Sequence, residues 1–207
     1  HDIEYLLTSP GLSDPLRELR VPFVDLNHDD VREIALKSWF TGLRSMVLPA
    51  TVLRADLVVS VPKLKTHHWA GMTCSMKNFF GVVPGAVYGW PKNLLHVKGI
   101  HASILDLVAT VRPGLTIVDG IVGMEGDGPI MGRPRPVGFV AMGSDLPAVD
   151  ATCARVLGFG RSGLELGVLD APAGPLLSLL YALQTIFAPF GELVYEPRVE
   201  VWPSAPR

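Results

Sequence analysis

Short apolar runs alternate with helical patterns along this chain, and that alternation limits its fold more than any other feature. The runs cover Val21–Leu26, Asp56–Val61, Leu115–Gly120 and Val137–Met142. Their nearly continuous apolarity is typical of strands that are covered on both faces. Helical spacing follows Gly99 and ends near Arg112, because Pro113 disfavours helix in the residue before it. A second helix is expected after Asp145, its N-cap, with Pro147 in the first turn. The alternation predicts an α/β fold, with a layered, largely parallel or mixed sheet and helices on both faces.

The chain has the size and composition of one ordinary domain. It has 207 residues, of which 48% are hydrophobic and 18% charged, enough to bury a full core. The net charge of −2 gives no global attraction to nucleic acid, and the sequence contains no recognised nucleic-acid module. Cys74 and Cys153 are too few for a disulfide framework and fit a reducing compartment, so we expect a cytoplasmic location. Because the chain begins at His1 and not at Met, we expect residues 1–207 to be a single domain from the later part of a longer protein.

One long uncharged stretch lies between Asp170 and Glu192. Its prolines leave only residues 176–188 for an uninterrupted helix, which is about 20 Å long at 1.5 Å per residue. A helix that spans a membrane needs about 20 apolar residues. We therefore expect a buried helix, or a homo-oligomer interface through 176–188, in preference to a membrane contact.

Positive charge is concentrated in one window of the chain, from Leu57 to Leu105, which contains no Asp or Glu. Five of the six lysines (Lys63, Lys65, Lys77, Lys92, Lys98) and four of the six histidines (His67, His68, His96, His101) lie in it. Clustered like charges repel one another, so an anion that binds among them would relieve the repulsion. The window follows a predicted strand, and ligands of α/β sheets gather beyond the carboxyl ends of strands. The sequence predicts a small anionic ligand in a cleft there; the alternative is a solvated basic loop that pairs with acids elsewhere.

The residue types in the window suggest two kinds of role. His67 and His68 are candidates for proton transfer, and we expect only one of them to face the site. Lys77 is a candidate nucleophile or anion anchor, because a lysine beside other cations loses basicity; the alternative is a solvent-facing helix lysine. Exposed N–H groups at the start of a helix near Ser75 would add to the anion site. The residues expected to bind the anion or cofactor are Lys63, Lys65, Thr73, Ser75, Asn78, Gly81, Gly85 and His96.

A glycine-rich acidic loop follows the predicted strand at Leu115–Gly120 and carries Asp119, Glu125 and Asp127. Carboxylates at a strand end can hold a divalent metal, orient a lysine or accept a proton. The alternative is an ordinary turn, because Asp and Gly are the residues that turns require. The cofactor therefore stays unidentified, with a divalent metal or an anionic organic molecule as the candidates.

Three segments together resemble the domain of unknown function 362 (DUF362) family: "DLVVSVPKLKTHHWAGMTCSMKNFFGVVPG", "LHVKGIHASILDL" and "LTIVDGIVGMEGDGPIMGRPRPVGFVAMGSDLPAVDAT". The resemblance covers about Asp56 to Gly158, so the core family motifs lie at 56–158. Many members of that family carry ferredoxin-like iron–sulfur segments, which implies an association with iron–sulfur proteins. A cluster needs four thiolates and this chain has two cysteines, so none is expected within it.

The segment "HHWAGMTCSMKNFFGVVPG" is also distantly similar to the cofactor-binding segment of nickel-pincer lactate racemases. This resemblance implies that His67 or His68 and Lys77 lie over a cofactor or substrate, and that "GMEGDGP" occupies the place of that family's glycine-rich Asn-Pro loop. It does not imply nickel, racemisation or a covalent adduct.

Two classes of function remain open from the sequence. The first is an enzyme, cofactor- or metal-dependent, that acts on a small anionic metabolite with proton transfer by a histidine. The second is a non-catalytic domain that binds a ligand, a metal or an electron-transfer partner. Loss of the histidine should abolish turnover in the first case and matter little in the second.

Overall fold

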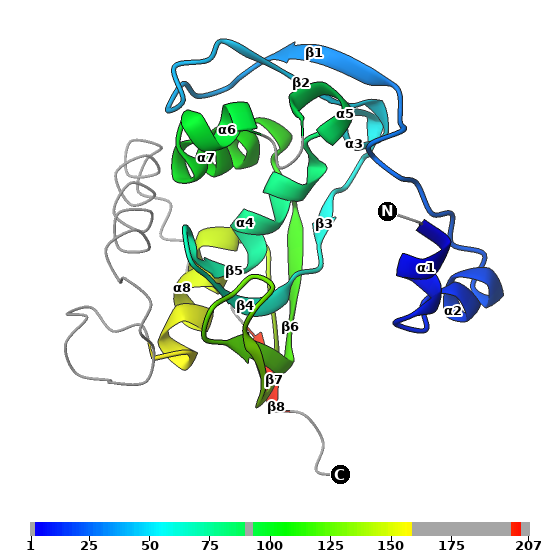
Figure 1. Ribbon diagram of the computed structural model, residues 1–207, viewed down its shortest axis with the longest axis vertical. Coiled ribbons are helices and arrows are strands. Elements are labelled where there is room, and N and C mark those ends of the chain that lie inside the picture. The colour runs from blue at the N-terminus through cyan, green and yellow to red at the C-terminus, as the bar shows by residue number, and fades with distance from the viewer. Residues whose placement is uncertain (1–2, 90–92, 159–199, 204–207) are drawn as a thin grey trace.

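The computed structural model describes residues 3–89, 93–158 and 200–203, and shows an α/β fold with helices packed around a mixed sheet (Figure 1). Among the described residues this sheet has six strands in the order β5-β4-β6-β7-β8, with β3 beside the start of β6. The strands are β3 (Val59–Ser60), β4 (Lys63–His67), β5 (Gly71–Thr73), β6 (Leu115–Glu125), β7 (Arg133–Gly143) and β8 (Glu200–Pro203). The predicted fold class is confirmed.

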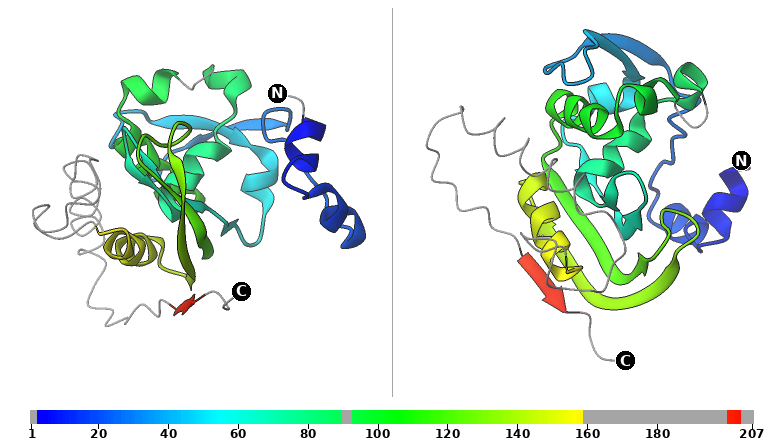
Figure 2. Two further views of the ribbon diagram at one scale, coloured as in Figure 1. Left: turned by 60° about the horizontal axis from the view of Figure 1, so that its bottom comes forward. Right: turned by 60° about the vertical axis from the view of Figure 1, so that its left-hand side comes forward.

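Parallel pairing in this sheet is confined to β3 and β4, which both lie parallel to β6. The other pairs, β4–β5, β6–β7 and β7–β8, are antiparallel. The sheet is therefore mixed and not largely parallel, because β6 and β7 form one long hairpin that pairs from Thr116–Gly143 to Glu125–Arg133. Figure 2 shows this hairpin curving along helix α8 (Leu146–Val156).

The remaining elements surround the sheet. They are the helices α1 (Ile3–Thr8), α2 (Ser13–Glu18), α3 (Ala50–Arg54), α4 (Ser75–Asn78), α5 (Gly85–Tyr88), α6 (Asn93–Val97) and α7 (Ile100–Val111), a 3-10 turn (Phe79–Val82), and an antiparallel pair β1 (Val31–Ala35) and β2 (Ser45–Pro49). The β1–β2 pair lies over α6 and α7, and α1 and α2 stand beside the body (Figure 1). The loop between β1 and β2 is fastened to α7 by the buried Asp106 carboxylate, which accepts hydrogen bonds from Ser38, Phe40 and Thr41.

The two helices with clear local signals form as predicted. Helix α7 ends at Val111, and Arg112 after it takes a left-handed backbone conformation (φ 53°). At the start of α8 the Asp145 carboxylate accepts a hydrogen bond from the Ala148 N–H at 2.9 Å, as an N-cap should. With α4 they bury the core against the sheet, and its largest fully buried side chains include Leu64, Met76, Phe79, Ile104, Leu107, Val118 and Val149.

Two of the predicted strands were wrong in whole or in part. The Val21–Leu26 run is irregular, with Val21, Phe23 and Val24 exposed, and pairs with no strand among the described residues. In Asp56–Val61 only Val59–Ser60 pairs with β6, and pairing resumes in β4 after Pro62, which has no N–H to donate to a ladder. The predicted interface helix at 176–188 lies outside the described residues. Within the part of the chain that is described, no helix is both long and apolar enough to cross a membrane.

Candidate functional site: a histidine–lysine surface

Strand β4 carries the first residues of the site. Its side chains alternate, so Leu64 and Thr66 are buried beneath the sheet while Lys63 and Lys65 are turned outward. The antiparallel pairing with β5 places Thr73 directly opposite Lys65, on the same side of the sheet. The Oγ1 atom of Thr73 is buried and has no hydrogen-bond partner among the described residues.

The end of β4 is fixed by the backbone of the β6–β7 loop. Thr66 donates its hydroxyl to the Gly126 carbonyl at 2.8 Å, and the His68 N–H donates to the Gly128 carbonyl at 3.0 Å. The loop approaches so closely that a Cβ on Gly128 would overlap the Thr66 carbonyl. This approach fixes both the end of β4 and His68, which follows it.

The Gly128 carbonyl also orients the ring of His68. The ring Nδ1 lies 2.7 Å from the Gly128 oxygen, and because a carbonyl can only accept, Nδ1 carries a proton. In the neutral ring this leaves a lone pair on Nε2, the arrangement that suits a general base or a metal ligand. His68 is exposed, so that atom belongs to the solvent-facing side of the site.

His67 has the opposite character. It is only 7% exposed, and its Nδ1 accepts hydrogen bonds from the Trp69 and Ala70 N–H groups at 3.2 and 3.1 Å. Burial, followed by the charges of Lys77, His68, Lys65 and His96, lowers the pKa of His67 from 6.5 to about 3. His67 is therefore neutral near pH 7 and is held as an acceptor for the turn after β4.

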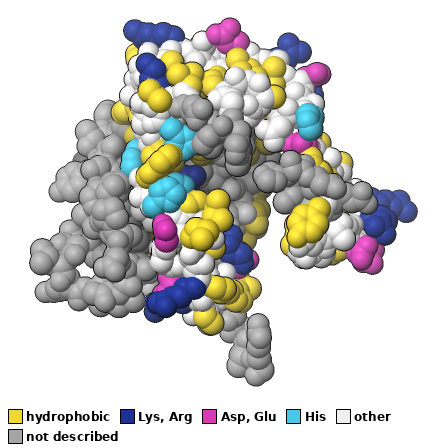
Figure 3. Space-filling model, viewed as in Figure 1, with side chains coloured by type: hydrophobic (Ala, Val, Ile, Leu, Met, Phe, Trp, Pro, Cys, Tyr) yellow, Lys and Arg dark blue, Asp and Glu magenta, His cyan; other side chains and the backbone are white. Residues whose placement is uncertain are grey.

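A chain of ring contacts joins three separate segments into one surface. Rings follow one another from His67 to His68 (5.1 Å between centroids), Trp69 (5.1 Å), His96 (4.9 Å) and Phe80 (5.1 Å). The Lys77 Nζ lies 5.0 Å from the centre of the Phe80 ring, a cation–π contact. We call the residues Lys65, His67, His68, Lys77 and His96 the histidine–lysine surface. Figure 3 shows histidine side chains on either side of a hydrophobic one on this face, with positive charge beside them.

The short helix α4, which carries Lys77, is held from below by α8. Both oxygens of the fully buried Asp150 carboxylate accept backbone N–H groups at the start of α4, from Ser75 at 2.7 Å and from Met76 at 3.1 Å. Burial raises the pKa of Asp150, although these hydrogen bonds oppose the shift. The N–H groups that the sequence suggested for an external anion are thus already used by an internal carboxylate. Asp150 was missed because a helix residue so distant in the sequence gives no local sign of capping α4.

Several residues that were predicted to bind the ligand have hydrogen-bond partners inside the fold, most of them around α4. The Ser75 side chain is fully buried and shares a 3.0 Å hydrogen bond with Thr116 of β6. Asn78 donates its amide to the Ser60 hydroxyl at 3.1 Å, and the Gly85 N–H donates to Asn27 at 2.8 Å. Burial, together with Cys153 and Asp150, raises the pKa of the Cys74 thiol well above its usual value. These groups support the surface, and Gly81 lies exposed beside Phe80.

The predicted acidic residues are arranged around arginines and a lysine. Asp119 forms an ion pair with Lys63, and Glu125 pairs with Arg133 (2.7 Å) and Arg135. These arginines lower the pKa of Glu125, the hydrogen bond from Arg135 contributing most. Asp127 is exposed in the loop between Gly126 and Gly128. In the described part of the chain no three His, Cys, Asp or Glu side chains are grouped so as to hold a metal ion.

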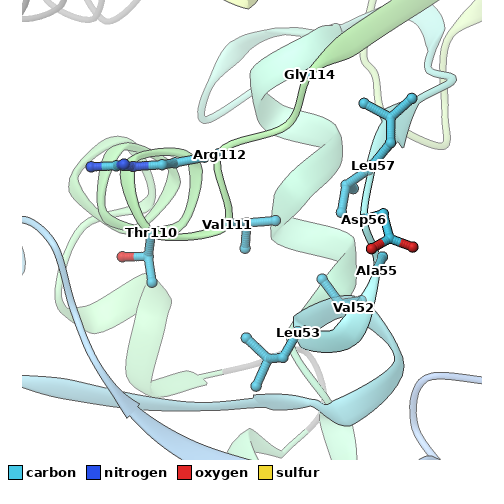
Figure 4. Close-up of a pocket in the computed structure, with 10 residues that line it drawn as sticks. Val52, Leu53, Ala55, Asp56, Leu57, Thr110, Val111, Arg112 and Gly114 are labelled. Carbon is cyan, nitrogen blue, oxygen red and sulfur yellow. The ribbon is translucent and has the colours of Figure 1, made fainter.

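A pocket of about 270 Å³ lies elsewhere, between the α3–β3 connection and the end of α7 (Figure 4). Apolar side chains such as Leu53, Leu57 and Val111 line it. Its two charged residues, Asp56 and Arg112, point in different directions in Figure 4, so no charge converges there. It also lies at the start of β3, whereas ligands of α/β sheets gather at the carboxyl ends of strands. We therefore place the candidate site at the histidine–lysine surface.

The fold and this surface define an α/β domain with a basic, histidine-rich region at a strand end. The profile of the DUF362 family, described as "Domain of unknown function (DUF362)", matches residues 2–155, and the chain belongs to that family. The match extends further toward the N-terminus than the motifs recognised at 56–158.

One curated relative is the "Thylakoid-associated protein sll1697" of Synechocystis sp. (strain ATCC 27184 / PCC 6803 / Kazusa). It is 36% identical over 148 residues, which cover 69% of this chain and 43% of that protein. The chain therefore spans less than half the length of this relative. No solved structure matches the chain.

Proposed function

We propose that the chain binds a small anionic metabolite or cofactor at the histidine–lysine surface. The observation that carries the proposal is the convergence of Lys65, Lys77, His68 and His96 around the buried ring of His67. Besides burial, every group that lowers the pKa of His67 is a lysine or another histidine. Positive side chains that gather around one buried ring attract an ion of the opposite sign.

The ion pairs nearby also support an anion site at Lys65. Lys63 is matched by Asp119 and the two arginines of β7 by Glu125, so those cations have internal counter-ions. Lys65 has a weaker polar contact, 3.5 Å from its Nζ to the Pro129 carbonyl. A carboxylate or phosphate would form a stronger, charge-assisted hydrogen bond there. Thr73, opposite Lys65, has a buried hydroxyl without a hydrogen-bond partner among the described residues, and a bound anion would supply an acceptor for it.

Proton transfer by His68 is the step that would make this protein an enzyme. Its Nδ1 is tied to the Gly128 carbonyl, which turns the other ring nitrogen into the reactive one. His67 is the weaker candidate, because its Nδ1 lone pair is used by two backbone N–H groups. The distant similarity to nickel-pincer lactate racemases would put Lys77 on the same ligand, and it remains a prediction.

The alternative function is a non-catalytic domain that binds a ligand, a metal or an electron-transfer partner. The name of the cyanobacterial relative associates that protein with thylakoids, but the match leaves more than half of it uncovered. Association with a membrane or a redox partner is therefore the weaker proposal for this chain. A divalent metal would need ligands beyond His68 and His96.

The test compares lysine variants in titration calorimetry with inorganic phosphate, oxalate and citrate. Lys65→Gln and Lys77→Gln should each weaken the tightest of these anions about five- to tenfold, roughly 1 to 1.4 kcal/mol. Lys37→Gln, the same charge change on the exposed Lys37 outside the acid-free window, should leave affinity within about twofold. Equal effects of all three variants would show diffuse attraction and contradict the proposal. Normal anion binding by His68→Gln would be compatible with both a carrier and an enzyme. Only turnover of a bound anion by the unaltered protein would favour the enzyme.

A further inference from the structure

The loop that joins β6 and β7 turns three backbone carbonyls toward β4 and exposes two large apolar side chains together with the Asp127 carboxylate. The Gly126, Gly128 and Pro129 carbonyls all accept hydrogen bonds from the end of β4. Ile130 and Met131, the next two residues, are each 79% exposed. Two large exposed apolar side chains thus follow directly after the carbonyls that contact Lys65 and His68.

A third exposed apolar side chain borders the same site. Trp69 is 53% exposed and lies between the rings of His68 and His96. Single exposed hydrophobic residues are ordinary, but apolar side chains that gather around a polar site are typical of ligand-binding regions. In Figure 3 hydrophobic side chains appear on this face next to the histidines and the positive charge.

The β6–β7 loop therefore joins two chemically distinct parts, one polar and one apolar. Lys65 and His68 offer a positive charge and a hydrogen-bonding ring, and both contact the loop at consecutive carbonyls, Pro129 and Gly128. Ile130 and Met131 continue from those carbonyls. A ligand whose charged group meets Lys65 and His68 has these apolar side chains as its immediate neighbours.

We propose that the anion bound at the histidine–lysine surface is amphipathic: a carboxylate or phosphate on an apolar chain. Its charged group contacts Lys65 and His68, and its chain covers Ile130 and Met131 and approaches Trp69. This assignment of the ligand class rests on the proposed function. It explains why the loop exposes apolar side chains at a place where charge alone would be enough for a simple anion.

The test is a series of unbranched carboxylates from acetate to octanoate, used below the concentrations at which they aggregate. Burial of a methylene strengthens binding about fourfold when it is complete, so we expect a two- to fourfold gain per methylene. The double variant Ile130→Ser with Met131→Ser should flatten this dependence and leave acetate affinity unchanged. Leu19→Ser, at an apolar residue that is 74% exposed on the end of α2, is the matched control and should leave the series as it is.

The outcomes separate the two proposals. If all chain lengths bind with one affinity that Lys65→Gln weakens, the amphipathic ligand is wrong and the anion site stands. If none of these carboxylates binds, and inorganic phosphate, oxalate and citrate do not bind either, both proposals fall. Binding to phosphatidylglycerol vesicles without any binding of the monomeric series would also overturn the inference, because the apolar loop would then serve a lipid surface. The amphipathic ligand is supported if affinity rises with chain length, if the Ile130/Met131 double variant removes this rise, and if Leu19→Ser keeps it.

Discussion

At the scale of the residue, neighbouring histidines of the same sequence motif have different tasks. His67 accepts two backbone N–H groups and is kept neutral by burial and surrounding positive charge, whereas His68 is exposed and donates to a carbonyl. Strand alternation alone would turn His67 outward like Lys63 and Lys65, but its ring is buried and accepts hydrogen bonds from the following turn, whereas His68 already belongs to that turn. The doublet therefore supplies one ring that is buried in the structure and one ring that is exposed to solvent.

The low pKa of His67 predicts how stability depends on pH. Its pKa is about 3 in the folded protein and near 6.5 in the unfolded chain, so between these values the unfolded state binds the extra proton. The free energy of unfolding should fall as pH is lowered from about 6.5 toward 3. His67→Gln keeps an acceptor but cannot titrate, and it should make this dependence shallower in urea unfolding followed between pH 4 and 8. If His67→Gln leaves the pH dependence of the free energy of unfolding unchanged, the pKa of His67 is not lowered by burial and the surrounding charge.

The individual site residues were only partly predictable. The acid-free window, which is visible in the sequence, contains the segments that carry Lys65, His68, Lys77 and His96, and their role as a site stays a prediction. It could not show that Lys63 pairs with Asp119, since that contact depends on the parallel register of β4 and β6. Which positive charges have internal counter-ions is decided by strand pairing and not by local composition.

At the scale of the element, the short helix α4 depends on a residue from another helix. Four residues are too few for a helix to be stable alone. The Asp150 carboxylate of α8 accepts the two N–H groups at its start and so takes the place of a local N-cap. Lys77 and the Phe80 ring beneath it are positioned by this contact.

Replacement of this carboxylate should therefore destabilise the protein and disturb the site. Asp150→Asn loses one of the two acceptors and should lower the free energy of unfolding by about 1 to 3 kcal/mol. It should also weaken anion binding, because Lys77 shifts with α4. Asp145→Asn is the matched control, since Asn caps a helix about as well as Asp, and should cost little. If the two variants are equally stable in chemical denaturation, Asp150 does not hold α4.

Helices could be predicted better than strands for a physical reason. The limits of α7 and α8 are set by neighbours along the chain, Pro113 and the Asp145 cap. A strand needs a partner, and the Val21–Leu26 run has none among the described residues despite its apolar sequence. The lengths of β6 and β7 were likewise underestimated. The residues around their glycine-rich loop have the composition of a turn, and they are strand only because the two strands pair there.

At the scale of the whole molecule, the mixed sheet brings three distant segments together. The end of β4, the helix after β5 and helix α6 supply the histidine–lysine surface, and the β6–β7 loop closes one side of it. The fold class followed from the sequence, and the acid-free window contains every residue of the proposed site. The role of Asp150 and the inward turn of the loop depend on contacts across the sheet and required the structure.

The central claim is that this surface, and not the positive charge of the window as a whole, receives an anion. Side-chain nitrogen spectra of histidine- and lysine-labelled protein, titrated with octanoate and with inorganic phosphate, test it most directly. The account predicts saturable shifts of the His68, His96 and Lys65 resonances at one shared ligand concentration, with His28 and Lys37 unmoved. Shifts of the same size at His28 and Lys37, or none at His68 and Lys65 at saturating ligand, would contradict it.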